Sequence, residues 1–123
     1  MMRSARVLVI GSSLPNRTVH HYGHGDQIEF VALEDWLREP RNAERAEMVV
    51  VEVAEIPPVK ECRVLLSLAE MLPTARRVAV IRANYTSVLY ELFVSGATHF
   101  VFGEVDEFLC RMLKETARNL EMD

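Results

Sequence analysis

The stretch Met48-Val49-Val50-Val51-Glu52-Val53 decides the fold. It is an apolar run dominated by β-branched residues, which is the pattern of a strand that a parallel sheet buries on both faces. One carboxylate, Glu52, stands near its end, just before Ala54-Glu55-Ile56-Pro57-Pro58. Because open α/β sheets bind ligands at the carboxyl ends of their strands, we expect Glu52 to lie at the functional edge of the sheet.

The composition is that of one ordinary soluble domain spanning residues 1–123, with 50% hydrophobic and 26% charged residues. A net charge of −4 leaves no basic surface for direct nucleic-acid binding. No apolar run approaches the roughly 18 residues of a membrane span, and the start of the chain lacks the apolar region of a signal peptide. We therefore predict a cytoplasmic protein without membrane partners, in which Cys62 and Cys110 stay reduced.

Strand and helix patterns alternate along the rest of the chain. Strands are expected at 6–10, 27–33, 77–81 and 98–102, in addition to the central one. Helical spacing of apolar residues appears between Pro58 and Pro73, over 85–95 and from Val105 onward. The segments 14–25 and 34–46 contain glycine or proline and can hold only short or irregular helices. This alternation predicts a five-stranded parallel sheet with helices on both faces.

The helical spacing also predicts which side chains face the core. In the two middle helices, the inward residues are expected to be Cys62, Leu65, Leu66, Ala69 and Leu72, and then Leu89, Leu92 and Phe93.

Three stretches make the chain similar to a known family. They are 6–10, 47–53 and Ser95-Gly96-Ala97-Thr98-His99-Phe100-Val101-Phe102, the last of which looks like a small-Gly-Ala-x-x-aromatic entry to a fifth strand. With these stretches at these spacings, the whole chain resembles the receiver domain of bacterial two-component response regulators. The resemblance implies a flavodoxin-like fold with strand order 2-1-3-4-5.

The phosphorylation site that the resemblance implies is altered at every position. A working receiver has two acidic residues after strand one to hold Mg²⁺, a phosphoaccepting Asp after strand three, a Thr or Ser after strand four and a Lys after strand five. This chain places Gly11 and Ser12 at the acidic pair, Glu52 at the phosphoacceptor, Arg82 at the Thr/Ser position and Gly103 at the Lys position.

These changes remove the chemistry of phosphoryl transfer. Without the acidic pair, Glu52 is the only obvious anionic ligand for Mg²⁺, and the cations that neutralise charge on a transferring phosphoryl group are missing. Glu52 also carries one methylene more than Asp, and a nucleophile displaced by more than an ångström reacts poorly. We therefore predict no phosphotransfer, no enzymatic activity, no cofactor and no metal.

Two interpretations of Glu52 remain open from the sequence. It is either a solvated carboxylate at the mouth of the sheet, or the partner of Arg82, whose planar guanidinium fits a carboxylate. The second would fix the domain in one signalling state. Phe100 stands at the aromatic switch position that the resemblance implies, and we expect it in the core because it has no hydroxyl to bring to a polar site.

A partner surface is predicted on the helix over 85–95. Tyr90 and Val94 fall on the side opposite its buried stripe, where polar residues would be expected. Together with the last strand and the closing helix, they resemble the face through which receivers form dimers. We expect a phosphorylation-independent, receiver-like signalling domain that acts by protein interaction or dimerisation, for example as the N-terminal regulatory part of a transcription activator.

The alternative function is a flavodoxin-like domain that binds a small ligand or nucleotide through the loops after Ile10, Val53 and Ile81. Neither a dinucleotide fingerprint nor a phosphate-binding loop is present in the sequence. The three histidines at positions 20, 21 and 24 are expected on the surface, because a glycine lies between them and no further ligand follows nearby.

Overall fold

The computed structural model describes residues 6–11, 28–40, 46–82, 86–105, 107–109 and 111–112. The elements are β1 (Arg6–Gly11), β2 (Ile28–Ala32), α2 (Leu33–Arg38), β3 (Ala46–Val53), α3 (Val59–Met71), β4 (Arg76–Ile81), the 3₁₀ turn η1 (Thr86–Val88), α4 (Leu89–Val94) and β5 (His99–Phe102). The described residues from Val105 to Met112 are helical as well. Ser12, the segment 14–25 with its histidines, and Cys110 lie outside the described residues.

The five strands form one parallel sheet in the order β2-β1-β3-β4-β5, which confirms the predicted topology. The first strand in sequence pairs with both β2 and β3, so the chain changes winding direction between β1 and β3. The middle of β3 is fully buried: Val49, Val50 and Val51 are inaccessible to solvent. Its β-branched run therefore sits at the centre, as expected for a strand covered on both faces.

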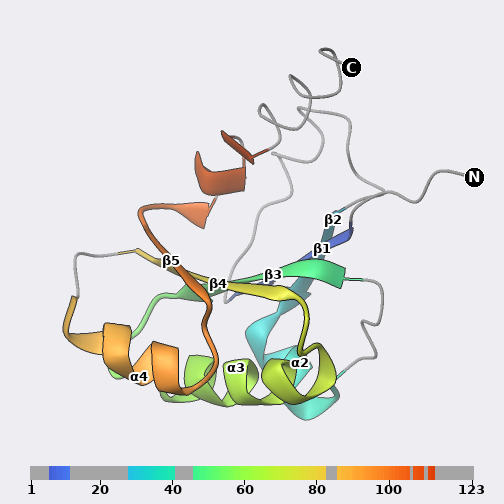
Figure 1. Cartoon of the computed structure of the whole chain (residues 1–123), viewed down its shortest axis with the longest axis horizontal. Coiled ribbons are helices and arrows are strands. Elements are labelled where there is room, and N and C mark those ends of the chain that lie inside the picture. Colours follow the sequence, from blue (N-terminus) through green and yellow to red (C-terminus); the bar gives the residue numbers. More distant parts are fainter. Residues whose placement is uncertain are drawn as a thin grey trace, which may run out of the picture.

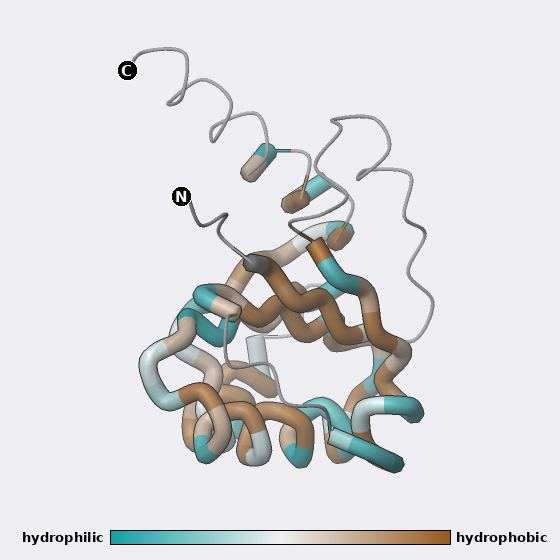
Figure 2. The backbone as a smooth tube through the Cα atoms, turned by 90° about the vertical axis from the view of Figure 1, so that its right-hand side faces the viewer, coloured by the Kyte–Doolittle hydropathy of each residue, from teal (hydrophilic) through white to brown (hydrophobic). Residues whose placement is uncertain are grey.

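Helices cover both faces of the sheet (Figure 1). α2, α3 and α4 lie together on one face, where Trp36, Leu65, Leu68 and Leu92 build the larger apolar cluster. On the other face, Val105 and Leu109 pack with Val50 and other strand residues into a second cluster. Figure 2 shows the apolar residues concentrated along the strands between these two layers.

Helix α2 is brief, as predicted, but the inward stripes of α3 and α4 differ from the prediction. Phe93 was expected inside and is 61% exposed, because Val88, Leu92 and Ser95 occupy the buried positions around this short helix. Leu66 is also exposed, since each helical residue turns by about 100° and Leu65 already faces the core. Both predictions were wrong for the same reason. Each helix has more consecutive apolar residues than its buried face can hold, so some of these residues are exposed to solvent.

Candidate functional site

The carboxyl ends of β1, β3, β4 and β5 meet at one edge of the sheet. Backbone hydrogen bonds continue the strand pairing past the strand ends: the Arg82 N–H donates to the Val53 carbonyl at 3.3 Å, and the Gly103 N–H donates to the Ile81 carbonyl at 2.9 Å. Gly11 ends β1 at this edge. The structure thus brings four of the five altered receiver positions to neighbouring strand ends, and the fifth, Ser12, lies outside the described residues.

Glu52 does not reach the mouth of the sheet. It is the penultimate residue of β3, pairs in register with Val80 and is only 6% exposed. Because side chains alternate along a strand, its carboxylate lies on the face that holds Val50 and the second apolar cluster. The first of the two interpretations that the sequence left open, a solvated Glu52 carboxylate, was therefore wrong.

Arg82 extends from the end of β4, and its Nε lies 3.5 Å from the carboxylate oxygen Oε2 of Glu104. Glu104 follows Gly103 directly, at the end of β5. Both side chains are about half exposed, so this ion pair contributes about 1 kcal/mol or less. The sequence identified Arg82 as a carboxylate binder but missed Glu104 as its acceptor. The order of the elements carried a signal for this pair, because the two residues follow adjacent strands.

Phe100 is half-buried and packs against the edge of the larger apolar cluster, so the expectation that it is a core residue is met only in part. No group of three or more histidine, cysteine or acidic residues in the described ranges is arranged to hold a metal ion. Cys62 is a free thiol whose Sγ lies 3.8 Å from the Glu91 carbonyl, and it packs at the junction of α3 and α4. No helix in the described part of the chain is long and apolar enough to cross a membrane.

A small pocket beside the β3–α3 loop contains a buried carboxyl group that the sequence did not single out. Its lining residues are Ala32, Leu33, Glu34, Ala54, Glu55, Lys60 and Glu61. Glu61, in the first turn of α3, is 4% exposed, and burial raises its pKa above 4.5. Hydrogen bonds from the backbone N–H groups of Glu61 and Ala54 act in the opposite direction and lower this pKa. Glu61 shares a helical face with Val64, Leu65 and Leu68, and that spacing could have revealed its burial.

The neighbouring ammonium group is already paired. Lys60 Nζ lies 2.5 Å from Glu34 Oε1, which links α3 to α2 at the rim of the pocket. The hydrogen bond to Glu34 raises the pKa of Lys60. Among the described residues, the pocket therefore offers no cation free to bind a phosphate group, and the other charged residues of its lining, Glu55 and Glu61, are acidic.

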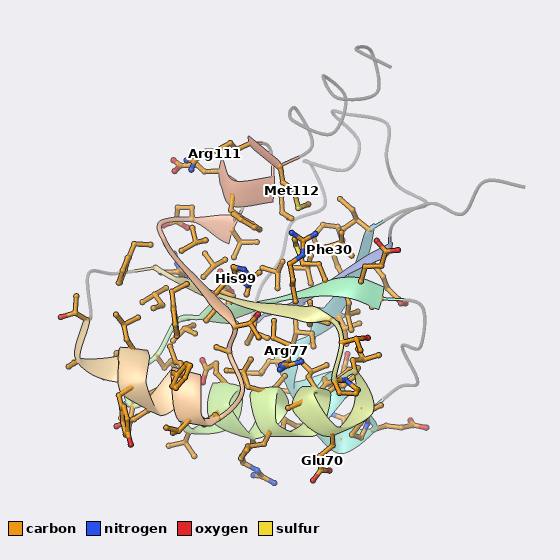
Figure 3. The ribbon with its side chains drawn as sticks, in the orientation of Figure 1. Phe30, Glu70, Arg77, His99, Arg111 and Met112 are labelled. Atoms are coloured by element: carbon orange, nitrogen blue, oxygen red, sulfur yellow. The ribbon has the colours of Figure 1, made fainter. Side chains whose placement is uncertain are left out.

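Arg77 joins three segments from the first half of β4. Its Nε donates to the Gly96 carbonyl at 2.6 Å, and its Nη1 donates to the carbonyls of Leu72 and Ala75 at 3.0 and 3.1 Å. Figure 3 shows the side chain between the sheet and the C-terminal half of α3. One guanidinium thus ties the end of α3 to the turn between α4 and β5, a role that the sequence did not predict.

The outer side of α4 is apolar. Tyr90 is 75% exposed, and Phe93 and Val94 are also mostly exposed; these three residues are called the α4 surface below. The sequence predicted the exposure of Tyr90 and Val94. Phe93 enlarges the surface beyond that prediction.

Comparison with solved structures identifies the architecture. Chemotaxis response regulator CheY4 of Vibrio cholerae is similar with a TM-score of 0.66 at 17% identity, over 92% of this chain and 98% of that one. A CheY-like receiver domain protein from Methanospirillum hungatei has a TM-score of 0.65 at 13% identity, over 98% of each chain. The chain has the fold of a response regulator receiver domain. A pilus assembly protein (CpaE) from Burkholderia thailandensis has the same fold, with a TM-score of 0.61 at 14% identity, over 93% of this chain and 98% of that chain.

Comparison of the sequence with protein families and curated proteins gives no further information about the chain. No protein-family model matches the chain, and no curated protein matches it. At these low sequence identities, the similarity to solved structures shows the fold of the chain but not its function. The function must therefore be argued from the residues at the carboxyl edge and on the surface.

Proposed function

We propose that this receiver-fold domain is a phosphorylation-independent signalling module, which acts by binding a protein partner or a second copy through the α4 surface, β5 and the closing helix. Such a domain works in the cytoplasm, alone or as the regulatory part of a longer protein such as a transcription activator. The observation that carries the proposal is the state of the carboxyl ends of the strands, where Glu52 is buried and Arg82 is paired with Glu104; Glu52 and Arg82 stand at positions that the phosphoryl group contacts in working receivers.

The chemistry of these groups supports the loss of phosphotransfer. Glu52 is buried on one face of β3, so an incoming phosphoryl donor has little access to its carboxylate. Arg82 already contacts Glu104, and Gly103 offers no ammonium group to a phosphoryl oxygen. Phosphoryl transfer depends on such cations to neutralise its transition state.

The attachment of α4 to α3 supports a fixed rather than switching surface. Arg77 holds the carbonyl of Gly96, just beyond α4. A Cβ atom at Gly96 would lie 3.2 Å from both the Ala69 Cβ and the Leu65 carbonyl, so the turn packs closely on α3. An α4 held in this way presents Tyr90 and Phe93 in one orientation, which favours binding without a prior conformational change.

Incubation with acetyl phosphate and Mg²⁺, followed by intact-mass spectrometry, tests the first half of the proposal. We expect no added phosphoryl group under conditions that fully modify a working receiver measured in parallel. A phosphoryl adduct that disappears in Glu52→Gln would contradict the proposal.

A charge placed on the α4 surface tests the second half. Tyr90→Glu and Val94→Glu should each abolish association, measured by sedimentation velocity for self-association and by affinity capture for other partners. Glu70→Arg, on an exposed residue that points away from the sheet on α3, is the matched control and should leave association unchanged (Figure 3). Unchanged association in both α4 variants would remove this surface from the proposal.

The alternative, a small-ligand site, is favoured by one observation, the pocket beside the loop after Val53. Its acidic lining disfavours nucleotides and other phosphates. A thermal-shift screen decides the matter, because a ligand at 100 times its dissociation constant stabilises the fold by about 2.7 kcal/mol.

A further inference from the structure

The strand β5 lies at one end of the sheet and has an unusual composition for that position. Its neighbour on one side is β4, and the sheet order places no strand of the described sheet on the other. Edge strands are commonly protected from pairing by lysine, proline or inward-pointing charges. The sequence of β5 is His99-Phe100-Val101-Phe102, which contains none of these, and Phe102 is 45% exposed.

The hydrogen bond of Gly103 fixes which backbone groups of β5 face outward. In a parallel pair, the residues that bond to a given neighbour alternate along the strand. The Gly103 N–H donates to the Ile81 carbonyl of β4. Val101 lies two residues before Gly103, so its N–H points toward β4 as well. The N–H and C=O groups of Phe100 and Phe102 consequently point away from the sheet.

We propose that β5 pairs antiparallel with β5 of a second copy, around a twofold axis at Val101, to form a continuous ten-stranded sheet. This inference rests on the proposed function and names its partner. In this register Phe100 of each chain lies opposite Phe102 of the other. Their outward N–H and C=O groups form four hydrogen bonds between the chains, and Val101 faces its own copy as a non-hydrogen-bonded pair.

The side chains of β5 suit this register. Phe100 packs against the larger cluster on the α4 side, and Phe102, two residues on, lies on the same side. Each interchain pair is therefore aromatic on aromatic, a favourable cross-strand combination. On the opposite side, Val101 meets Val101 without a charge or a polar group between the chains.

The ends of the strand bring no two acidic residues together in the same register. Glu104 of one chain lies across from Thr98 and beside His99 of the other, and both Glu104 and His99 are exposed. Figure 3 shows His99 on the face of the sheet opposite α3. The twofold axis places Glu104 of one chain near the uncharged Thr98 of the other, with no like charges directly opposite.

Proline at an outward-facing position tests the backbone pairing. Phe102→Pro removes an N–H that makes no bond to β4, so the fold should persist. It deletes two of the four interchain hydrogen bonds, and the dimer should weaken by about 30-fold relative to Phe102→Val. Sedimentation velocity over a concentration series measures this difference. Equal dissociation constants for the two variants would contradict the register.

A cysteine crosslink tests the same register without depending on the proline variant. In a chain with Cys62→Ser and Cys110→Ser, Val101→Cys should form a disulfide-linked dimer under mild oxidation, because Cα atoms of a non-hydrogen-bonded pair lie about 4.5 Å apart. His99→Cys is the control: it lies opposite Gly103 of the other chain and should not crosslink.

The outcomes separate this inference from the proposed function. A chain that is monomeric at every concentration, or that crosslinks through neither cysteine, overturns the β5 pairing, while loss of partner binding in Tyr90→Glu still supports the function. A dimer that crosslinks through Val101→Cys while acetyl phosphate modifies Glu52 supports the pairing and overturns the proposed function.

Discussion

Replacing Arg77 tests how much the fold depends on one guanidinium group. Its Nε and Nη1 donate to three carbonyl oxygens at 2.6, 3.0 and 3.1 Å, and a fourth, that of Pro73, lies at 3.4 Å. These carbonyls belong to the end of α3, the loop before β4 and the turn after α4. Arg77→Leu removes every donor, whereas Arg77→Lys keeps the charge and loses the planar fork.

The expected loss follows from the number and exposure of these contacts. A hydrogen bond from a charged donor contributes about 1.5–3 kcal/mol when buried, and less where water competes. Because the Arg77 side chain is half-buried and three of its contacts are short, we expect Arg77→Leu to lower the free energy of unfolding by about 2–4 kcal/mol. Arg77→Lys retains one or two contacts and should lose about 1–3 kcal/mol. The total free energy of unfolding of a typical domain is only about 5–15 kcal/mol, so either loss would be a large fraction of it.

Urea unfolding followed by Trp36 fluorescence measures both variants, because Trp36 is the single tryptophan and is buried. The midpoint should fall while the slope of free energy against urea stays unchanged. Arg63→Leu, on the exposed side of α3, is the control and should change the unfolding free energy by less than about 0.5 kcal/mol. An Arg77→Leu variant as stable as this control would refute the reasoning.

The remaining predictions also concern stability. Gly96→Ala should lower the free energy of unfolding by about 1–3 kcal/mol more than Gly103→Ala in urea titrations; both have positive φ, but only Gly96 has close neighbours at its Cβ position. Trp36→Phe should be within about 1 kcal/mol of wild type by circular dichroism, since the lost packing is offset by removing an indole N–H that has no acceptor among the described residues; a loss as large as that of Trp36→Ala would contradict this. Glu61 has a folded pKa raised above its unfolded value, so its protonation adds stability as pH falls through the folded pKa, and this gain is lost as pH rises again. When the pH is lowered from 7 to 5, the urea midpoint of the wild type should therefore rise relative to the midpoint of Glu61→Gln. A difference between the two midpoints that stays constant with pH would exclude Glu61 as the cause.

The sheet was predictable because each of its strands carries a pattern that depends only on burial. The run Met48 to Val53 is apolar except for Glu52, which is typical of a strand that a parallel sheet buries on both faces, and the alternation of strands and helices then leaves few topologies. The exposed positions of Leu66 and Phe93 were not predictable in this way. Both adjoin apolar residues that already fill the inward positions, and only the length and phase of the helices decide which members face water.

The sequence was sufficient to predict which residues lie at the ends of the strands, but not which of their side chains contact one another. The sequence correctly placed Glu52, Arg82 and Gly103 near the same edge of the sheet. It did not predict that Glu52 would be buried or that Glu104 would bind Arg82, because these outcomes depend on strand register and on where β3 ends. A shift of one residue along a strand moves a side chain to the opposite face.

The polar groups at this edge share one property that bears on the proposed function. Arg82 is paired with Glu104, Lys60 with Glu34, and the Glu61 carboxyl accepts backbone hydrogen bonds. A ligand that bound through any of these groups would first have to break an existing contact, which subtracts from its affinity. The apolar residues of the α4 surface and β5 have no such competitor among the described residues, and burying them is favourable in itself. Burying the apolar α4 surface and β5 against a protein therefore costs fewer existing contacts than binding a small anionic ligand at the polar groups, which favours a protein partner.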